Sequence, residues 1–228
     1  IKMFTSKEQA QNWIENIKRF GSRLDLSRIS KALEILGNPH REFKSIHVAG
    51  TNGKGSTTNY IKNILVESGF KVGLYTSPYV VDFNERIKIN HQSISDESLV
   101  YYTNILHDVS DKLIEEDEEN IITFFEVLTV ISFLYFRDEK VDFAVIEVGL
   151  GGLLDATNVI VPEVSVITNV SYDHMKQLGN SLESIALNKL GIVKENVPLI
   201  TAIEDMHLFP LIYEVAASKN ARVKIINH

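Results

Sequence analysis

The sequence of 228 residues contains no cysteine, one tryptophan, three methionines and five prolines. Without cysteine, neither a disulfide framework nor a zinc site built on thiolates can form, and the composition fits a reducing compartment. Positive charge is also scarce, since 23 lysines and arginines stand against 30 aspartates and glutamates and the formal net charge is -7. Because no basic stripe is present, a nucleic acid is not expected as a partner.

Long apolar runs are lacking too. The longest nearly unbroken one, "VLTVISFLYF" at residues 127–136, is too short to cross a bilayer, which requires about 20 residues. We interpret this run as a buried helix. The start of the chain has no apolar signal core, so we expect a cytoplasmic protein without a membrane partner.

Hydrophobic residues make up 44% of the chain, enough for a substantial core. The first 40 residues have helical spacing, with Thr5 and Glu8 as a capping box, and helices are also expected after Ser95 and after the capping box of Thr123 and Glu126. "EEDEEN" at 115–120 is interpreted as a solvated loop. Strands are expected at 43–49, 71–77, 141–148, 163–170, 197–202 and 221–226, with a short one at 85–90, and further helices at 54–68, 180–190 and 208–218. This alternation predicts an α/β fold with a mostly parallel sheet flanked by helices.

The glycine-rich stretch "GTNGKGST" lies between an expected strand and an expected helix. In that position, backbone N–H groups and the positive end of the helix dipole form a phosphate site. Lys54 is expected to neutralise the β- and γ-phosphates and Ser56 to ligate magnesium. The stretch differs from the usual phosphate-binding pattern because Gly55 follows Lys54 directly. The alternative is a simple turn with a surface lysine. The candidate ATP-binding residues are Gly50, Thr51, Asn52, Gly53, Lys54, Gly55, Ser56 and Thr57.

Polar residues follow three other expected strands. Glu147, Ser77 and His174 each lie at or beyond a strand's carboxyl end, where parallel sheets bind their ligands. Each also has a structural alternative: Glu147 as a cap for the turn "GLGG", Ser77 as a turn residue before proline, and His174 as a surface side chain. Lys189 has no distinction that sequence reasoning alone can identify.

Four motifs then resemble one family in order: "VAGTNGKGST", "YTSPYVVDFNERI", "IEVGLGGLLDATN" and "SYDHMKQLGNSLESIALNKLGIVK". They are similar to the folylpolyglutamate synthases and dihydrofolate synthases, a branch of the Mur ligases, from about residue 24 to the end. The resemblance implies a P-loop NTPase-like domain, the Mur ligase central domain. It also implies an ATP-dependent ligase of folate biosynthesis and one-carbon metabolism, which converts a carboxylate into an acyl phosphate that L-glutamate attacks.

The resemblance also implies roles for single residues. Lys54, His174 and Lys189 would be catalytic, with Lys189 carbamylated as in many members. Two magnesium ions would be held by Ser56, Ser77, Glu147, His174 and the carbamate of Lys189. The pterin or folate would contact Thr123, Phe125, Asp155 and Ala156. The chain departs from the family at Tyr79, Asp82 and Leu153, where histidine, a basic residue and arginine are common.

Family members are usually longer than this chain. We therefore expect residues 1–228 to be the N-terminal ATP-binding domain, incomplete at its C-terminal end and without the glutamate-ligase domain, and inactive alone. The expected partners are ATP, L-glutamate and dihydropteroate or a reduced folate, with a monomeric protein. The alternatives are another Mur-type amide ligase acting on cell-wall precursors, a P-loop kinase or nucleotide switch, and a binding module without activity.

Overall fold

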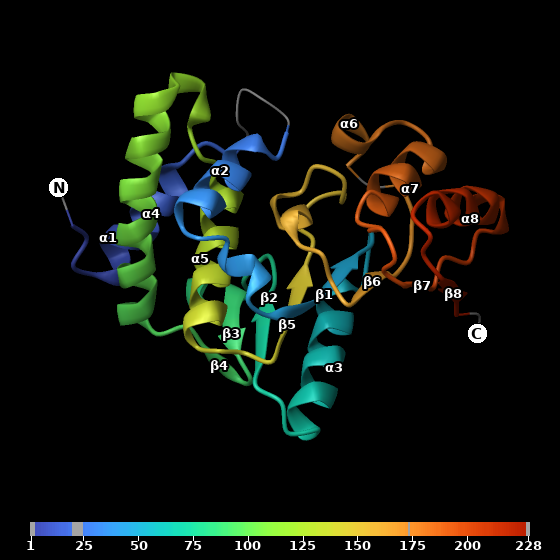
Figure 1. Cartoon of the computed structure of the whole chain (residues 1–228), viewed down its shortest axis with the longest axis horizontal. Coiled ribbons are helices and arrows are strands. Elements are labelled where there is room, and N and C mark those ends of the chain that lie inside the picture. Colours follow the sequence, from blue (N-terminus) through green and yellow to red (C-terminus); the bar gives the residue numbers. More distant parts are fainter. Residues whose placement is uncertain (1–2, 20–24, 173, 227–228) are drawn as a thin grey trace.

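The computed structural model describes residues 3–19, 25–172 and 174–226. Asp173 of the fourth motif and Leu24, near which the family resemblance begins, lie outside these ranges. An eight-stranded sheet in the order β4-β3-β2-β5-β1-β6-β7-β8 runs through the molecule (Figure 1). The strands are β1 (Lys44–Ala49), β2 (Val72–Tyr75), β3 (Ile87–Ile89), β4 (Gln92–Ser93), β5 (Phe143–Glu147), β6 (Val164–Ile167), β7 (Leu199–Thr201) and β8 (Val223–Ile225).

The strands from β2 to β8 in this order pair in parallel, as the alternating pattern predicted. At the edge beyond β2, β3 pairs antiparallel with both β2 and β4, and β3 and β4 form a hairpin. Since β1 lies between β5 and β6, the loops that follow these three strands meet at one edge of the sheet. The predicted fold class is confirmed, and the motifs lie at that edge.

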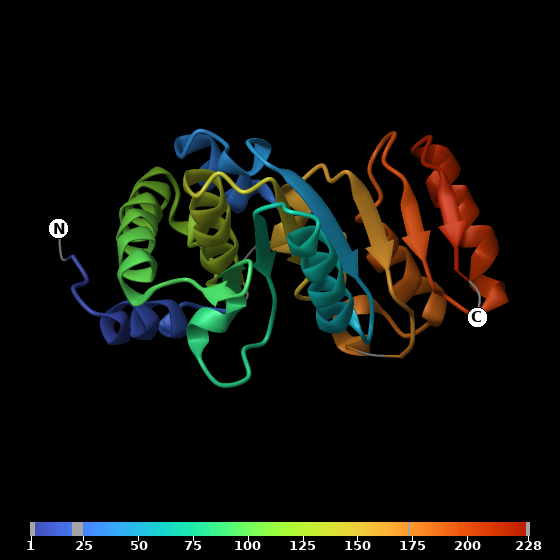
Figure 2. The same ribbon diagram turned by 90° about the horizontal axis from the view of Figure 1, so that it is seen from below.

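The helices cover both faces of the sheet (Figure 2). Helix α3 packs on one face, where Ile61 and Leu65 contact a cluster that includes Val48 and Val145. The large core on the other face includes the buried apolar run predicted at 127–136. The α-helices are α1 (Lys7–Asn16), α2 (Ser27–Ile35), α3 (Lys54–Glu67), α4 (Asp96–Glu116), α5 (Phe124–Asp138), α6 (Met175–Leu178), α7 (Leu182–Leu190) and α8 (Phe209–Ser218). The 3₁₀ helices are η1 (Pro39–Arg41), η2 (Phe83–Arg86), η3 (Glu118–Asn120), η4 (Ala156–Val159) and η5 (Met206–Leu208).

Two of the three predicted helix caps are confirmed and the third is wrong. Ser95 caps α4, and Thr123 and Glu126 form both hydrogen bonds of the predicted capping box on α5. The box predicted at Thr5 is wrong, because the neighbouring hydroxyl of Ser6 accepts from the Gln9 amide and α1 begins one residue later. Thr5 is outside the helix, and its amide and hydroxyl both donate to the Gln9 side chain.

The acidic stretch at 115–120 is not the simple solvated loop that its charge predicted. Glu115 and Glu116 form the last turn of α4, and the following residues form η3. Asp117 caps η3 by accepting from the Glu119 amide at 3.0 Å, and Asn120 is buried. Local capping therefore gives this charged run a defined structure. Among the described residues, no helix is long and apolar enough to cross a membrane.

Candidate functional site

The glycine-rich loop lies directly after β1 and leads into α3, the geometry expected of a phosphate-binding loop. Gly53 caps α3 with φ 77°, a conformation that a residue with a side chain adopts only at a cost. Lys54 is the first helical residue, and its Nζ donates to the Gly50 carbonyl at 2.9 Å, which keeps the ammonium group over the loop. Ser56 is exposed in the first turn of the helix. The loop therefore presents a cation, a hydroxyl and a helix N-terminus together.

A second segment, just after β6, holds the loop in place. The Asn52 amide donates to Asn169 Oδ1 at 2.9 Å, and the Thr51 amide donates to the Asn169 carbonyl at 3.1 Å. Thr168 Oγ1 donates to the Asn52 carbonyl at 2.6 Å. A Cβ on Gly50 would lie only 1.8 Å from Thr168 Oγ1, so this position requires glycine. Sequence reasoning missed Thr168 and Asn169. The available signal was a polar pair at the end of a strand expected at this edge.

Glu147 ends β5 beside the loop and is 4% exposed. Its Oε2 accepts from the Ser77 amide at 3.1 Å, and a Cβ on Gly55 would lie 3.9 Å from both carboxylate oxygens. Burial raises the pKa of Glu147, while the Ser77 amide and the charge of Lys54 oppose that rise. The structure thus brings Ser77, Glu147 and Lys54 together at the carboxyl edge of the sheet.

The loop "GLGG" after Glu147 packs against α6 and α7. A Cβ on Gly151 would lie 2.7 Å from Leu178 of α6, and one on Gly152 would lie 2.9 Å from the Lys189 carbonyl. Lys189 is buried in the last turn of α7, and His174 is an exposed residue that caps α6. Both therefore belong to elements that pack against this loop. Their roles as metal-binding and catalytic residues remain predictions.

The four residues expected to contact the pterin lie beside the same loop. Phe125 is half-buried, stacks on Tyr75 with ring centroids 5.7 Å apart, and would lie 2.6 Å from a Cβ on Gly149. Thr123 is the buried N-cap of α5, and the buried Ala156 begins η4, which packs against α5. Only Phe125 among the three presents a partly exposed side chain.

Asp155, the fourth, is 6% exposed and already has a full set of donors. Its Oδ1 accepts from the amides of Gly149 at 3.0 Å and Leu150 at 2.9 Å, and its Oδ2 accepts from both the amide and the hydroxyl of Thr157. Burial raises the pKa of Asp155, and these hydrogen bonds oppose the rise. Asp155 therefore fixes the shape of the loop that follows Glu147, a role that sequence reasoning did not identify.

A buried histidine extends this network into β1. His47 Nε2 lies 2.7 Å from Thr157 Oγ1, and the side chain is fully buried. Because the Thr157 hydroxyl donates to Asp155, neutral His47 donates from Nε2. Burial lowers the pKa of His47 to about 3, and the charge of Lys194 adds to this. The histidine was hidden from sequence reasoning because it lies inside an apolar strand.

This burial predicts acid sensitivity. An unfolded histidine takes up its proton near pH 6.5, whereas folded His47 resists it until about pH 3. Its contribution to the free energy of unfolding is therefore complete above pH 6.5. This contribution is lost as the pH falls from 6.5 toward about 3, by up to about 1.4 kcal/mol per pH unit. We expect His47→Gln to show a shallower pH dependence in urea unfolding between pH 6.5 and 4. His207→Gln, at an exposed position, is the control. Parallel curves for His47→Gln and the wild type would contradict the assignment.

The three departures from the family pattern have local roles. Asp82 caps η2 and forms an ion pair with Lys7 at 2.7 Å. Tyr79 packs against Phe83, with ring centroids 5.8 Å apart. Leu153 is about half exposed, and its amide donates to the Asn188 carbonyl at 2.9 Å.

The residues at this edge fit a hard divalent cation. One oxygen of Glu147, Oε1, makes no hydrogen bond to the described residues, and carboxylate and hydroxyl oxygens are the ligands that Mg²⁺ prefers. Within residues 3–19, 25–172 and 174–226, no three His, Cys, Asp or Glu side chains gather closely enough to hold a metal. A cation bound by Glu147 would therefore need further ligands, such as serine hydroxyls and phosphate oxygens of the nucleotide.

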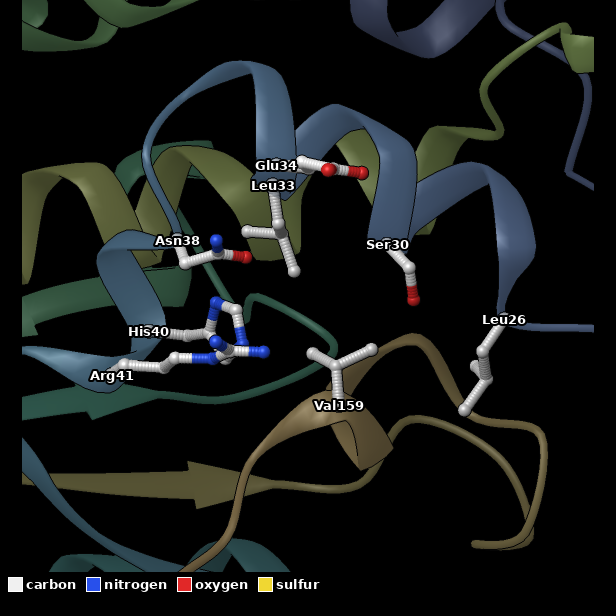
Figure 3. A pocket seen from close by; sticks show the side chains of 8 residues that line it. All are labelled: Leu26, Ser30, Leu33, Glu34, Asn38, His40, Arg41 and Val159. Carbon is white, nitrogen blue, oxygen red and sulfur yellow. The ribbon is translucent and has the colours of Figure 1, made fainter.

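Two hollows lie at the opposite edge, where β1, β5 and β6 begin. The first has a volume of about 450 Å³ and is open at the surface between α2 and η1 (Figure 3). It is lined by Leu26, Ser30, Leu33, Glu34, Asn38, His40, Arg41 and Val159. The second, of about 760 Å³, shares His40, Arg41 and Val159 with it. Neither includes a residue of the phosphate loop or its neighbours.

Comparison with known proteins identifies the family. The family model described as "Mur ligase middle domain" matches residues 48–227. The chain is 44% identical to the dihydrofolate synthase/folylpolyglutamate synthase of Bacillus subtilis over 202 residues, which cover 88% of the chain and 47% of that protein. It therefore spans about half the length of this relative.

Two solved structures share the fold. An FPGS–AMPPCP–folate complex has a TM-score of 0.91 at 39% identity, covering 96% of this chain and 53% of that one. E. coli FolC in complex with DHPP and ADP has a TM-score of 0.87 at 31% identity, covering 99% and 52%. The chain therefore belongs to the Mur ligase family and, within it, to the folylpolyglutamate synthase and dihydrofolate synthase branch.

Proposed function

We propose that the protein uses ATP to join L-glutamate to dihydropteroate, to a reduced folate, or to both, extending folylpolyglutamates in the second case. The observation that carries this proposal is that Lys54, Ser77 and Glu147 cluster at one edge of the sheet, where the loop that follows Glu147 packs against the partly exposed ring of Phe125 at Gly149. A phosphate site thus adjoins an aromatic surface. The relatives support it, since one was solved with AMPPCP and folate and another with DHPP and ADP.

The proposed reaction has two steps. A carboxylate oxygen of the acceptor attacks the γ-phosphorus, the bond to the ADP oxygen breaks, and an acyl phosphate forms. The amine of glutamate then attacks the acyl carbon, loses a proton and expels inorganic phosphate. In the first step the protein acts mainly through position and charge: Lys54 and the first-turn amides of α3 stabilise negative charge on the phosphate oxygens. The hydrogen bonds of Asn169 keep the loop in that shape.

Magnesium would neutralise further phosphate charge when bound. We propose Ser56, Ser77, Glu147 and His174 as its protein ligands, with two ions bound and Lys189 carbamylated. The burial of Lys189 against the loop after Glu147 supports its place in the site. Asp155 and His47 hold that loop through their hydrogen bonds.

The whole protein would include a second domain besides residues 1–228. We propose that residues 1–228 form most of an N-terminal ATP-binding domain, that a second domain contributes to binding glutamate, and that these residues alone do not turn over. The lengths of the relatives support this division. The intact protein would act as a cytoplasmic monomer.

The test is ADP release by the full-length protein. We expect release to require magnesium, L-glutamate and an acceptor, with dihydropteroate and tetrahydrofolate assayed separately, and the product to be an amide by mass spectrometry. A response to only one acceptor would assign one of the two activities. If neither acceptor stimulates ADP release, or if the acceptor emerges phosphorylated, the proposed function is wrong.

A further inference from the structure

Arg86, the last residue of η2, is a buried arginine whose positive charge has no carboxylate partner among the described residues. The side chain is 8% exposed, and its Nε is sealed from solvent without a partner. Its guanidinium makes no hydrogen bond or ion pair with residues 3–19, 25–172 or 174–226. A buried guanidinium normally has a carboxylate or carbonyl partner, because removing its five N–H donors from water is costly.

Three aromatic rings surround the guanidinium. Its central carbon lies 5.0 Å from the ring centroid of Tyr79, 5.5 Å from that of Phe124 and 5.7 Å from that of Phe83. Cation–π contacts of this kind each contribute about 0.5 to 2 kcal/mol. They offset part of the burial cost but supply no acceptor for the N–H donors, and Nε has no partner among the described residues. The surroundings therefore favour a planar ligand that carries hydrogen-bond acceptors.

The position of Arg86 relates it to the site already described. Its carbonyl accepts from the Thr76 amide at 2.9 Å, which places it beside the strand end that carries Ser77. Phe124 adjoins Phe125, which packs against Tyr75 and Gly149. Phe124, Phe125 and Tyr79 are only partly buried. These rings form an aromatic wall (Tyr79, Phe124 and Phe125) that continues from the phosphate site toward Arg86.

We propose that Arg86 recognises the heteroaromatic end of the acceptor by donating to its ring acceptor atoms. This inference rests on the proposed function and names a residue that sets its substrate specificity. The acceptor's reacting carboxylate must lie at Lys54, so it is not the group that Arg86 binds. A pteridine ring matches the remaining chemistry, since it is planar, stacks on aromatic side chains and carries nitrogen and oxygen acceptors.

The experiment measures equilibrium binding to the full-length protein, independent of turnover. Folate is the probe for the complete ligand, p-aminobenzoyl-L-glutamate is the same molecule without its heterocycle, and AMPPCP reports on the nucleotide site. Arg86→Met keeps the length of the side chain and its contact with the rings but removes every N–H donor. Arg86→Lys keeps the charge without the planar fork. Arg41→Met, at an exposed arginine of η1 on the opposite edge, is the matched control.

We expect Arg86→Met to weaken folate binding by about 10-fold or more, as for loss of a hydrogen bond from a charged donor. Binding of p-aminobenzoyl-L-glutamate and AMPPCP should change less than about twofold, with Arg86→Lys intermediate for folate. The melting temperature of Arg86→Met should not fall, because a buried charge has been replaced by an apolar side chain.

Other outcomes overturn the proposal. Equal losses for folate and the truncated ligand, unchanged folate binding, or a lowered melting temperature with weaker AMPPCP binding would each show that Arg86 has a structural role only. The proposed function is judged separately from ADP release by the wild-type protein. A wild-type protein that binds folate through Arg86 but releases no ADP would overturn the ligase assignment and leave this inference standing.

Discussion

Replacement of Lys54 by alanine is expected to lower acceptor-dependent ADP release by the full-length protein by roughly 10³-fold, the scale at which single charge-stabilising groups act in phosphoryl transfer. Lys54 begins α3 and its Nζ lies over the loop, 2.9 Å from the Gly50 carbonyl. No neighbouring cation in the loop "GTNGKGST" can replace it. The loss should include weaker nucleotide binding, because the same ammonium group would contact the β- and γ-phosphates.

The measurement combines ADP release with calorimetric titration of AMPPCP. Lys31→Ala, at an exposed lysine of α2, controls for the loss of one positive charge. We expect both variants to melt near the wild-type temperature, since a lysine on the surface of a helix contributes little to stability. Unchanged AMPPCP binding by Lys54→Ala would favour a binding module or a simple turn over a nucleotide site.

Replacement of Glu147 by glutamine is expected to lower the same activity by roughly 10²-fold, comparable to the loss of one preorganised electrostatic group. The amide keeps an oxygen that can accept from the Ser77 amide, which now bonds Oε2 at 3.1 Å. It removes the charge that would attract a divalent cation. The folded protein should be no less stable without the cation, because burial raises the pKa of Glu147 and the carboxylate is costly to keep ionised there.

Magnesium dependence separates this effect from a general loss of activity. The concentration of magnesium for half-maximal ADP release should rise markedly in Glu147→Gln while the KM for glutamate stays near the wild-type value. Glu139→Gln is the control, since Glu139 is an exposed carboxylate at the C-cap of α5, paired with Lys71 at 3.0 Å. If Glu147→Gln keeps the wild-type magnesium dependence, Glu147 does not hold the cation.

The fold could be predicted from sequence because its signals are local. A glycine-rich stretch followed a buried strand, and Thr123 with Glu126 marked the start of α5 correctly. The error at Thr5 had a local cause as well, because two adjacent hydroxyls, Thr5 and Ser6, compete to cap one helix. Periodicity identifies the helix but does not decide between neighbouring caps.

The site was only partly predictable, because its supports come from distant parts of the chain. The sequence marked Lys54, Ser77 and Glu147, each at a strand end. It did not reveal that Asn169 holds the phosphate loop, which depends on the pairing of β1 with β6. It also did not reveal that Asp155, whose contact with substrate stays a prediction, shapes the loop after Glu147 through four hydrogen bonds. Long-range pairing of this kind has no local pattern.

The proposal that ATP activates a carboxylate can be tested by isotope transfer. The acceptor is prepared with ¹⁸O in its reacting carboxylate, and the full-length protein is supplied with ATP, magnesium and L-glutamate. An acyl phosphate passes one carboxylate oxygen to the released phosphate, so each amide formed should yield one inorganic phosphate that carries ¹⁸O. Unlabelled phosphate, or release of AMP and pyrophosphate, would contradict the account.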